Sequence, residues 1–314
     1  MKLLHFLSAL LIISAIAAGP QWKFVMPVLE SGKADTFDET AVKDPSIVRF
    51  QDKWHLFYTA RGLNKYSIGY VAAPEWKDLN QAHRFPLPQL SGGEPVFAAP
   101  QAFFFRPKQE WFLIYQTTGS NYQPVYSHTK TIEKPESWSA PKPLAVKDEK
   151  AKWIDFWVIC DGTTAWLFYT RDHRDVYAMT TTLAAFPQGF GEPRKVFSGV
   201  HEAVHIYLAK SPRPNAKFAM LFETSREGGW RQYGLASAPD LGGPWSLIDG
   251  DFASSMNSEW SRDISHGELL RTGYDERLEA DLVNMQFLIQ GMPAAEHKGN
   301  YPDLRWRLGL IRNY

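Results

Sequence analysis

The fold is decided by a short hairpin pattern that first occurs as Asp44-Pro-Ser-Ile-Val-Arg-Phe50, Gln51-Asp-Lys53 and Trp54-His-Leu-Phe-Tyr-Thr59. The outer two pieces are rich in β-branched and aromatic residues, which favour extended strands. The middle piece is polar and three residues long, which is typical of a hairpin turn. A polar residue therefore opens a buried strand, and an aromatic-rich strand returns beside it.

The same pattern recurs four more times along the chain. The repeats open near residues 44, 100, 155, 202 and 267, so the steps are 56, 55, 47 and 65 residues. A period of this length, built from hairpins, indicates a β-propeller with one blade per repeat. We therefore predict an all-β, five-bladed β-propeller. A β-sandwich whose hairpins resemble one another by chance is the alternative.

Composition limits the classes of partner. The 34 basic and 34 acidic residues give a formal net charge of zero. Binding to nucleic-acid phosphates requires a basic surplus, so a nucleic-acid partner is not expected. Aromatic residues make up 14% of the chain, which suits a β-rich fold and a sugar-binding surface. The single cysteine, Cys160, excludes an internal disulfide and a structural zinc site built from cysteines.

The amino terminus has the pattern of a secretory signal peptide. Lys2 precedes an apolar stretch over residues 3–16, and small residues at 15, 17 and 18 form a cleavage signal. We expect a signal peptide over residues 1–18, one propeller domain over 19–314, and a secreted or periplasmic protein. No later apolar run is long enough to span a membrane, so no membrane partner is expected after cleavage. A monomer is expected.

Propeller geometry brings the first residues of the innermost strands to one mouth of the central channel. These residues are Asp44, Gln101, Asp155, Glu202 and the cluster His266-Gly-Glu268. Several carboxylates close together oppose folding by charge repulsion, so such a group indicates acid/base chemistry. Glycoside hydrolysis needs one carboxyl group to protonate the leaving oxygen and another to attack the sugar or activate water. Whether the reaction retains or inverts the configuration at the anomeric carbon stays open at this point.

Local strings over Trp22 to Leu310 resemble glycoside hydrolase family 62, the α-L-arabinofuranosidases that act on arabinoxylan. The strings are Ala41-Val-Lys-Asp-Pro-Ser46, Ala98-Ala-Pro-Gln-Ala-Phe103, Trp111-Phe-Leu-Ile-Tyr-Gln-Thr117, Trp153-Ile-Asp-Phe-Trp-Val-Ile-Cys-Asp161, Thr180-Thr-Thr-Leu-Ala-Ala-Phe-Pro-Gln-Gly-Phe190, Ile264-Ser-His-Gly-Glu268 and Arg305-Trp-Arg-Leu-Gly-Leu310. Their common order along the chain makes the resemblance specific.

The resemblance implies a role for each matching residue. Asp44 matches the general base of an inverting enzyme, Glu202 matches the general acid, and Asp155 matches the acid that tunes and positions it. Residues that match the arabinose pocket are Lys43, Gln101 and Arg231. His266 matches a histidine that approaches a calcium ion in the central channel, so calcium is the expected cofactor and an arabinoxylan-type polysaccharide the expected partner.

The sequence departs from the family pattern at three places, which bear on the polymer-binding face and on the edge of the sugar pocket. Ile289 stands where the family carries a tyrosine toward the polymer-binding face, and the turn over residues 172–175 is more charged than usual. His201 stands before Glu202 where the family usually has phenylalanine. On a regular strand His201 and His205 would share one face and Glu202 would point away, so no metal site is expected among them.

Two other functions stay open. One is a β-xylosidase or arabinanase of the kind found in the related family 43, which would keep the propeller and the three acids. The other is a carbohydrate-binding propeller without catalysis, which would be expected to lack one of the acids. Asp44, Asp155 and Glu202 are all present, and this favours an enzyme.

Overall fold

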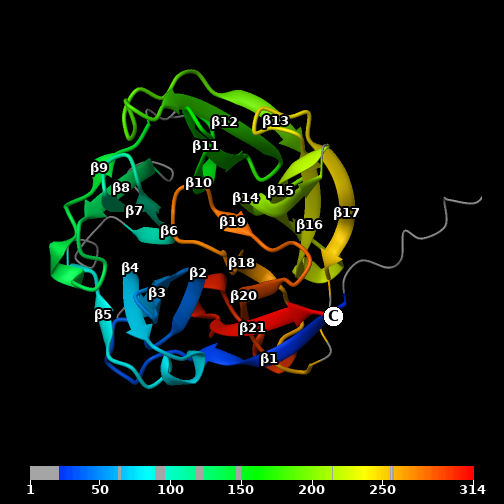
Figure 1. Cartoon of the computed structure of the whole chain (residues 1–314). Helices are drawn as coiled ribbons and strands as arrows, with labels where there is room; N and C mark the ends of the chain where they lie inside the picture. Colours follow the sequence, from blue (N-terminus) through cyan, green and yellow to red (C-terminus); the bar gives the residue numbers. More distant parts are fainter. Residues whose placement is uncertain are drawn as a thin grey trace, which may run out of the picture.

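The computed structural model describes residues 21–62, 65–88, 96–117, 123–145, 150–213, 215–254, 256 and 258–314. The predicted signal peptide over residues 1–18 lies outside this part. Five antiparallel sheets stand around a central axis as the blades of a propeller (Figure 1). The predicted fold is confirmed, and each predicted hairpin forms the inner two strands of one blade.

The strands of the first three blades follow one another in the chain, whereas the fourth and fifth blades each include one strand from elsewhere in the chain. The first blade holds β2 (Ala41–Phe50), β3 (Lys53–Gly62), β4 (Lys65–Ala73) and β5 (Arg84–Pro86), and the second β6 (Phe97–Phe105), β7 (Glu110–Thr117), β8 (Gln123–Thr129) and β9 (Lys142–Pro143). The third holds β10 (Trp153–Cys160), β11 (Thr164–Arg171), β12 (Asp175–Thr182) and β13 (Arg194–Ser198). The fourth holds β14 (Glu202–Arg213), β15 (Ala216–Ser225), β16 (Arg231–Ala238), β17 (Ser246–Ala253) and the short β19 (Glu279–Ala280). The fifth holds β18 (Ser265–Leu269), β20 (Gln286–Gly291), β21 (Arg307–Asn313) and β1 (Trp22–Leu29).

Helical structure in the described ranges is confined to 3-10 turns. They are Trp76–Asp78, Pro135–Ser137, Glu227–Gly229, Ala294–Glu296 and Tyr301–Asp303. Among these described elements, none has the length and apolar character of a membrane-spanning helix.

The first strand of the chain closes the ring. β1 pairs antiparallel with β21, so the amino-terminal strand becomes the outermost strand of the last blade (Figure 1). Trp22 fixes this closure, because its indole N–H donates to the Phe252 carbonyl oxygen at 2.8 Å and its ring lies 5.8 Å from that of Phe287. The hairpin repeat does not predict this pairing, because it joins residues from opposite ends of the chain.

Each innermost strand is kinked near the residue that the sequence pattern identified as its opener. The ladders of β2, β6, β10, β14 and β18 to their neighbours all shift register there, which is the signature of a β-bulge. Asp44, Ala99, Asp155 and Ala203 hold left-handed backbone angles, with φ between 47° and 57°. Such bulges redirect side chains, and here they lie where the acids enter the channel.

Side chains of the preceding blade accept hydrogen bonds from these bulges. We call Thr59, Gln116, Glu223 and Gln290 the blade-junction acceptors. Their partners are the backbone N–H groups of Ala99 at 2.8 Å, Asp155 at 3.0 Å, His266 at 2.9 Å and Asp44 at 2.9 Å, respectively. Every one of these acceptors comes from the second strand of its blade, so four of the five blade junctions share one interaction. At the junction between the third and fourth blades, the Ala203 N–H donates instead to Asp155 of β10.

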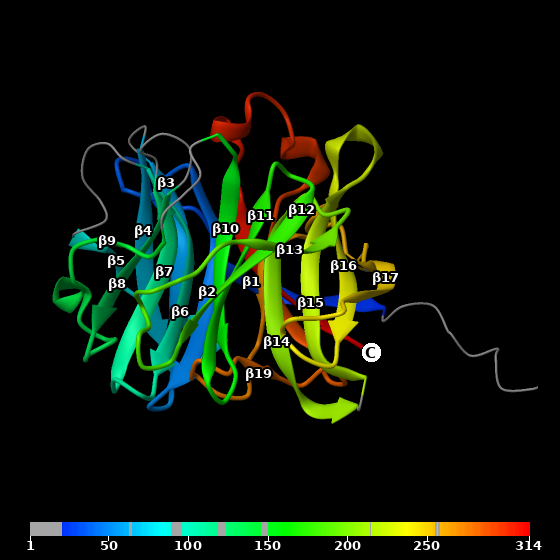
Figure 2. The ribbon, with the colours of Figure 1, turned by 90° about the horizontal axis from the view of Figure 1, so that it is seen from above.

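The opposite end of the channel is covered by the segment between β18 and β20, which includes β19 (Figure 2). This segment exchanges backbone hydrogen bonds with β6, β10 and β14 through Phe104, Cys160 and Leu208. Inside it, the buried Arg271 guanidinium lies 2.6 Å from a Glu268 carboxylate oxygen. The loop between β20 and β21 lies at the other end (Figure 2), and its Tyr301 hydroxyl accepts a hydrogen bond from Lys43, next to Asp44.

Trp22→Ala should lower the free energy of unfolding by about 3–5 kcal/mol, because it removes a buried indole and its hydrogen bond. Urea unfolding followed by tryptophan fluorescence measures the change. Lys23→Ala, at the exposed neighbouring position, is the control and should change stability by less than about 0.5 kcal/mol. Equal effects of the two substitutions would contradict the role given to Trp22 in closing the ring.

Candidate active site

Asp44 and Asp155 flank one imidazole at the mouth of the channel. The Nδ1 atom of His266 lies 3.5 Å from Asp44 Oδ1 and 3.9 Å from Asp155 Oδ2. Both aspartates are almost wholly buried, with exposed fractions of 6% and 5%. The two acids and the histidine come from three different blades, so the propeller brings them together as the repeat predicts.

Asp44 lies in the more positive part of the site. Burial by itself would raise the pKa of the Asp44 carboxyl, but Lys43, His266 and hydrogen bonds from Thr59 and Ala99 lower it below its ordinary value. Lys43 Nζ is 4.0 Å from Asp44 Oδ1 and donates to the Tyr301 hydroxyl at 2.9 Å. Asp44 is therefore held as a carboxylate, which is the form that a general base needs.

Asp155 lies in the more negative part. Its carboxylate accepts the backbone N–H of Ala203 at 2.8 Å. Burial raises the pKa of Asp155 to about 6; His266 opposes this rise, while the charges of Glu202 and Asp44 add to it. Two aspartates around one histidine thus have pKa values pushed in opposite directions, a pattern typical of acid/base sites.

Glu202 forms a second cluster with Glu223 and Arg231. Arg231 Nη1 lies 2.9 Å from Glu223 Oε1 and 3.4 Å from Glu202 Oε1, so one guanidinium bridges the two carboxyl groups. Burial would raise the pKa of Glu202, but Arg231, His201 and a hydrogen bond with Glu223 lower it. Burial and the nearby charge of Glu202 raise the pKa of Glu223 well above its ordinary value. Burial and mutual repulsion therefore favour one proton held between the two carboxyl groups.

The sequence pattern did not single out Glu223, although the repeat contains its signal. It ends the second strand of the fourth hairpin, Phe218-Ala-Met-Leu-Phe-Glu223, as Gln116 ends that of the second. The side chain is completely buried and also accepts a hydrogen bond from the Ser265 hydroxyl at 2.7 Å. The equivalent position in other blades holds threonine or glutamine, so an ionisable carboxyl group there makes Glu223 a candidate functional residue.

The acids are not at equivalent positions in their strands. Asp44 and Asp155 occupy the left-handed residue of their bulges, but in the fourth blade this residue is Ala203 and Glu202 precedes it. Glu202 is accordingly less enclosed, with 15% of its side chain exposed. The expected equivalence therefore holds for the two aspartates only.

Gln101 and Arg231, both expected in the arabinose pocket, bond to other groups of the protein. Gln101 is 1% exposed, and its amide group donates to the Val158 carbonyl oxygen at 2.8 Å and accepts the Val158 N–H at 2.7 Å. It joins the second and third blades rather than facing the opening. Arg231 clamps the two glutamates and also lines a pocket with Tyr301 and Trp306, so it borders the space a sugar would enter.

Ile289 differs from the expectation. It lies in β20 opposite Gly267, it is fully buried, and its side chain belongs to the hydrophobic core. It therefore does not border a polymer-binding face, because the period-two alternation of the strand directs it inward. Within the charged turn over residues 172–175, Asp175 is also buried, where it accepts the Ser198 hydroxyl at 2.8 Å.

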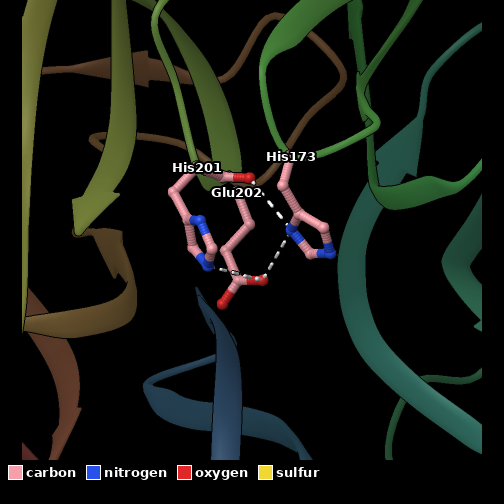
Figure 3. A group of neighbouring side chains, drawn as sticks. All are labelled: His173, His201 and Glu202. Atoms are coloured by element: carbon pink, nitrogen blue, oxygen red, sulfur yellow. Dashed lines mark hydrogen bonds and ion pairs between the residues drawn. The ribbon is translucent and has the colours of Figure 1, made fainter. Parts of the chain in front are cut away.

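His201 and Glu202 approach each other, contrary to the pattern of a regular strand (Figure 3). His201 Nε2 lies 3.8 Å from Glu202 Oε2, and His173 Nδ1 lies 3.5 Å from the same oxygen. The bulge at Ala203 breaks the alternation, so neighbouring side chains turn to one side. His205 points elsewhere and stacks on Trp157 with ring centroids 4.0 Å apart.

Polar groups surround His266 at the channel. The ring of His205 meets that of His266 edge to face at 5.2 Å, and the buried Nδ1 atom of His205 has no hydrogen-bond partner within the described part of the chain. Carboxylate oxygens of Asp44 and Asp155 face the same histidine. Oxygen donors of this kind suit a hard divalent cation that keeps several waters.

Comparison with known proteins places this geometry in a family. The model of "Glycosyl hydrolase family 62" matches residues 33–312. Alpha-L-arabinofuranosidase C of Cellvibrio japonicus (strain Ueda107) is 34% identical over 288 residues, which are 87% of this chain and 44% of that protein. This chain thus spans less than half the length of that relative.

Solved structures agree with the match. The catalytic domain of the GH62 alpha-L-arabinofuranosidase from Coprinopsis cinerea is 29% identical, with a TM-score of 0.85 over 94% of this chain and 97% of that one. A GH62 hydrolase in complex with xylotriose has the same identity and TM-score over 93% and 97% of the two chains. Sequence, fold and the gathered acids thus agree: the chain belongs to glycosyl hydrolase family 62.

Proposed function

We propose that this protein is an exported, inverting α-L-arabinofuranosidase that removes single arabinofuranosyl groups from an arabinoxylan-type polysaccharide. The observation that carries the proposal is the division of charge among the gathered acids. Asp44 is held ionised beside Lys43, while the pKa values of Asp155 and Glu223 are raised beside Glu202. One side of the site can accept a proton and the other can supply one.

The reaction follows as a single displacement. Asp44 takes a proton from a water molecule, and the water oxygen forms a bond to the anomeric carbon of arabinose. The bond from that carbon to the polymer oxygen breaks, and Glu202 protonates the leaving oxygen. The water attacks from the face opposite the leaving oxygen, so the configuration at the anomeric carbon inverts.

Glu202 needs a proton before each turnover. Arg231 and His201 favour its ionised form, whereas Glu223 keeps a proton and shares a hydrogen bond with it. We infer that the proton passes from Glu223 to Glu202 when the sugar binds, because the sugar removes Glu202 from water and raises its pKa, while Arg231, 2.9 Å from Glu223, stabilises the charge left on Glu223. Asp155 lies close by and positions the strand through Ala203.

The choice of polymer follows from the relatives and from charge. One GH62 hydrolase was solved with xylotriose, and the relative from C. japonicus is an alpha-L-arabinofuranosidase. The formal net charge of zero suits a neutral polysaccharide.

Export is supported by the apolar segment over residues 3–16, and sequencing the amino terminus of protein recovered outside the cytoplasm tests it. We also propose a monomer, since all the acids come from one chain; a dimer mass by light scattering would contradict this.

A calcium ion in the channel is part of the proposal. His266 would hold it, the carboxylates of Asp44 and Asp155 are the nearest anionic groups, and the ring of His205, whose buried Nδ1 has no partner in the described part of the chain, packs against His266. The ion would supply positive charge that offsets the repulsion among the acids.

Removing calcium should lower the thermal unfolding temperature, since a ligand that binds only the folded state stabilises it. Differential scanning calorimetry after treatment with a chelator, and again after calcium chloride is added back, measures the change. His266→Asn should abolish the response to calcium. An unfolding temperature that ignores calcium in the unmodified protein would refute the site.

Asp44→Asn and Glu202→Gln should each lower arabinose release from arabinoxylan by about 10²–10⁴-fold, because each removes one proton-transfer group. Chromatography of the released sugars measures the rate. Proton NMR of the first product of the unmodified enzyme should show the β anomer before it equilibrates.

Two matched controls accompany these variants. Asp52→Asn changes an exposed aspartate in the turn at the far end of the same hairpin strand, and Glu136→Gln changes an exposed glutamate. Both should keep normal activity. Release of xylose instead of arabinose, binding of oligosaccharide without turnover, or the α anomer as first product would each overturn the corresponding part of the proposal.

A further inference from the structure

Two histidines and a glutamate meet at the rim of the site (Figure 3). The ligand atoms of His173, His201 and Glu202 all lie within 4.8 Å of one another. The Nδ1 atom of His173 is 3.5 Å and the Nε2 atom of His201 3.8 Å from Glu202 Oε2. We propose that these three side chains form a binding site for a transition-metal cation of the zinc type, and that the bound cation takes Glu202 out of catalysis.

The backbone holds the three side chains together at a cost. His173 is the second residue of the turn between β11 and β12, and both it and Asp172 have left-handed angles, with φ of 48° and 55°. Glycine is favoured at the second position of such a turn, and a histidine there is strained. On the other side, the left-handed Ala203 turns His201 toward Glu202. The bulge at Ala203 recurs in other blades, so the strain particular to this cluster is the left-handed turn that carries His173.

The chemistry of the three groups selects the class of metal. Two imidazoles and one carboxylate, with water in the fourth position, form a common zinc site. Tetrahedral ligands at about 2.1 Å from zinc lie about 3.4 Å apart, so small side-chain rotations suffice to close this cluster. Calcium and magnesium prefer a shell of oxygens and should bind the cluster weakly.

Access and protonation also suit a metal. Both histidine side chains are 27% exposed, so a cation can reach them from solvent. Burial lowers the pKa of His201, Arg231, His173 and Lys152 lower it further, and Glu202 opposes them, so His201 is neutral and able to ligate near pH 7. His173 Nδ1 lies 3.2 Å from the His201 carbonyl oxygen and would give up that contact to the metal.

The effect on catalysis rests on the proposed function. Glu202 Oε1 faces Arg231, and Oε2 faces the histidines. A cation on Oε2 would keep the carboxylate ionised, and the leaving oxygen would then lack its proton donor. Zinc bound to His173, His201 and Glu202 would thus inhibit the enzyme.

Isothermal titration calorimetry with zinc chloride tests the site. The protein carries no histidine tag, has been treated with a chelator, and is kept in excess calcium chloride at pH 7 so that the channel site is filled. We expect one zinc ion per chain. His201→Phe and His173→Asn should each weaken zinc binding by about tenfold or more, since each removes a ligand. His83→Asn, at an exposed histidine outside the cluster, should leave it unchanged.

Binding by calorimetry does not depend on activity, so this test stands apart from the proposed function. Thermal unfolding of each variant without zinc confirms that it is folded. Absence of saturable binding, or equal binding by the two cluster variants and the control, would overturn the site. If arabinose release is present, zinc should inhibit it reversibly and His201→Phe should relieve the inhibition; binding without inhibition would overturn the catalytic consequence.

Discussion

The structure depends on one repeated hydrogen bond, donated by the backbone N–H of a bulged inner strand to a side chain of the preceding blade. Thr59, Gln116, Glu223 and Gln290 are the acceptors, and each comes from the second strand of its blade. A bulge leaves a backbone donor outside the ladder, and a buried donor without a partner is costly. An acceptor from the preceding blade satisfies this donor, and it fixes both the spacing of the blades and the direction in which each bulge points its side chains.

At two blade junctions the acceptor is a carboxyl group, and there the hydrogen bond also helps to build the acid/base site. Glu223 accepts the N–H of His266, and Asp155 accepts the N–H of Ala203. These acids hold neighbouring blades in place while their burial raises their pKa values. Lys43 and Arg231 are the permanent cations among them, which is too little positive charge for all the buried acids to ionise together. A proton is therefore retained by the architecture itself, close to the residue that must deliver it.

The hairpin repeat was sufficient to predict the five blades, because strand and turn signals are local in the sequence. The closure through β1 could not be predicted in that way, since Trp22 pairs with the far end of the chain. Side-chain direction was less predictable, because bulges break the alternation on which such predictions rest. The bulge at Ala203 explains why His201 reaches Glu202. Gln101 uses both ends of its amide group to bind Val158, which explains why it joins two blades and does not face the opening. Glu223 was detectable as a carboxyl group at a repeated glutamine or threonine position.

The central claim is that the site divides its protons unequally, with Asp44 ionised and Asp155 and Glu223 protonated in mildly acidic solution. Carbon-13 NMR of the aspartate and glutamate side-chain carboxyls, followed from acid to neutral pH and assigned with Asp44→Asn, Asp155→Asn and Glu223→Gln, measures this directly. The account predicts that Asp44 titrates below its ordinary range, that Asp155 titrates with a pKa of about 6, and that Glu223 keeps its proton well above its ordinary range. If Asp44 loses its proton at a higher pH than Asp155, or if all three carboxyls titrate in the ordinary range, the account is contradicted.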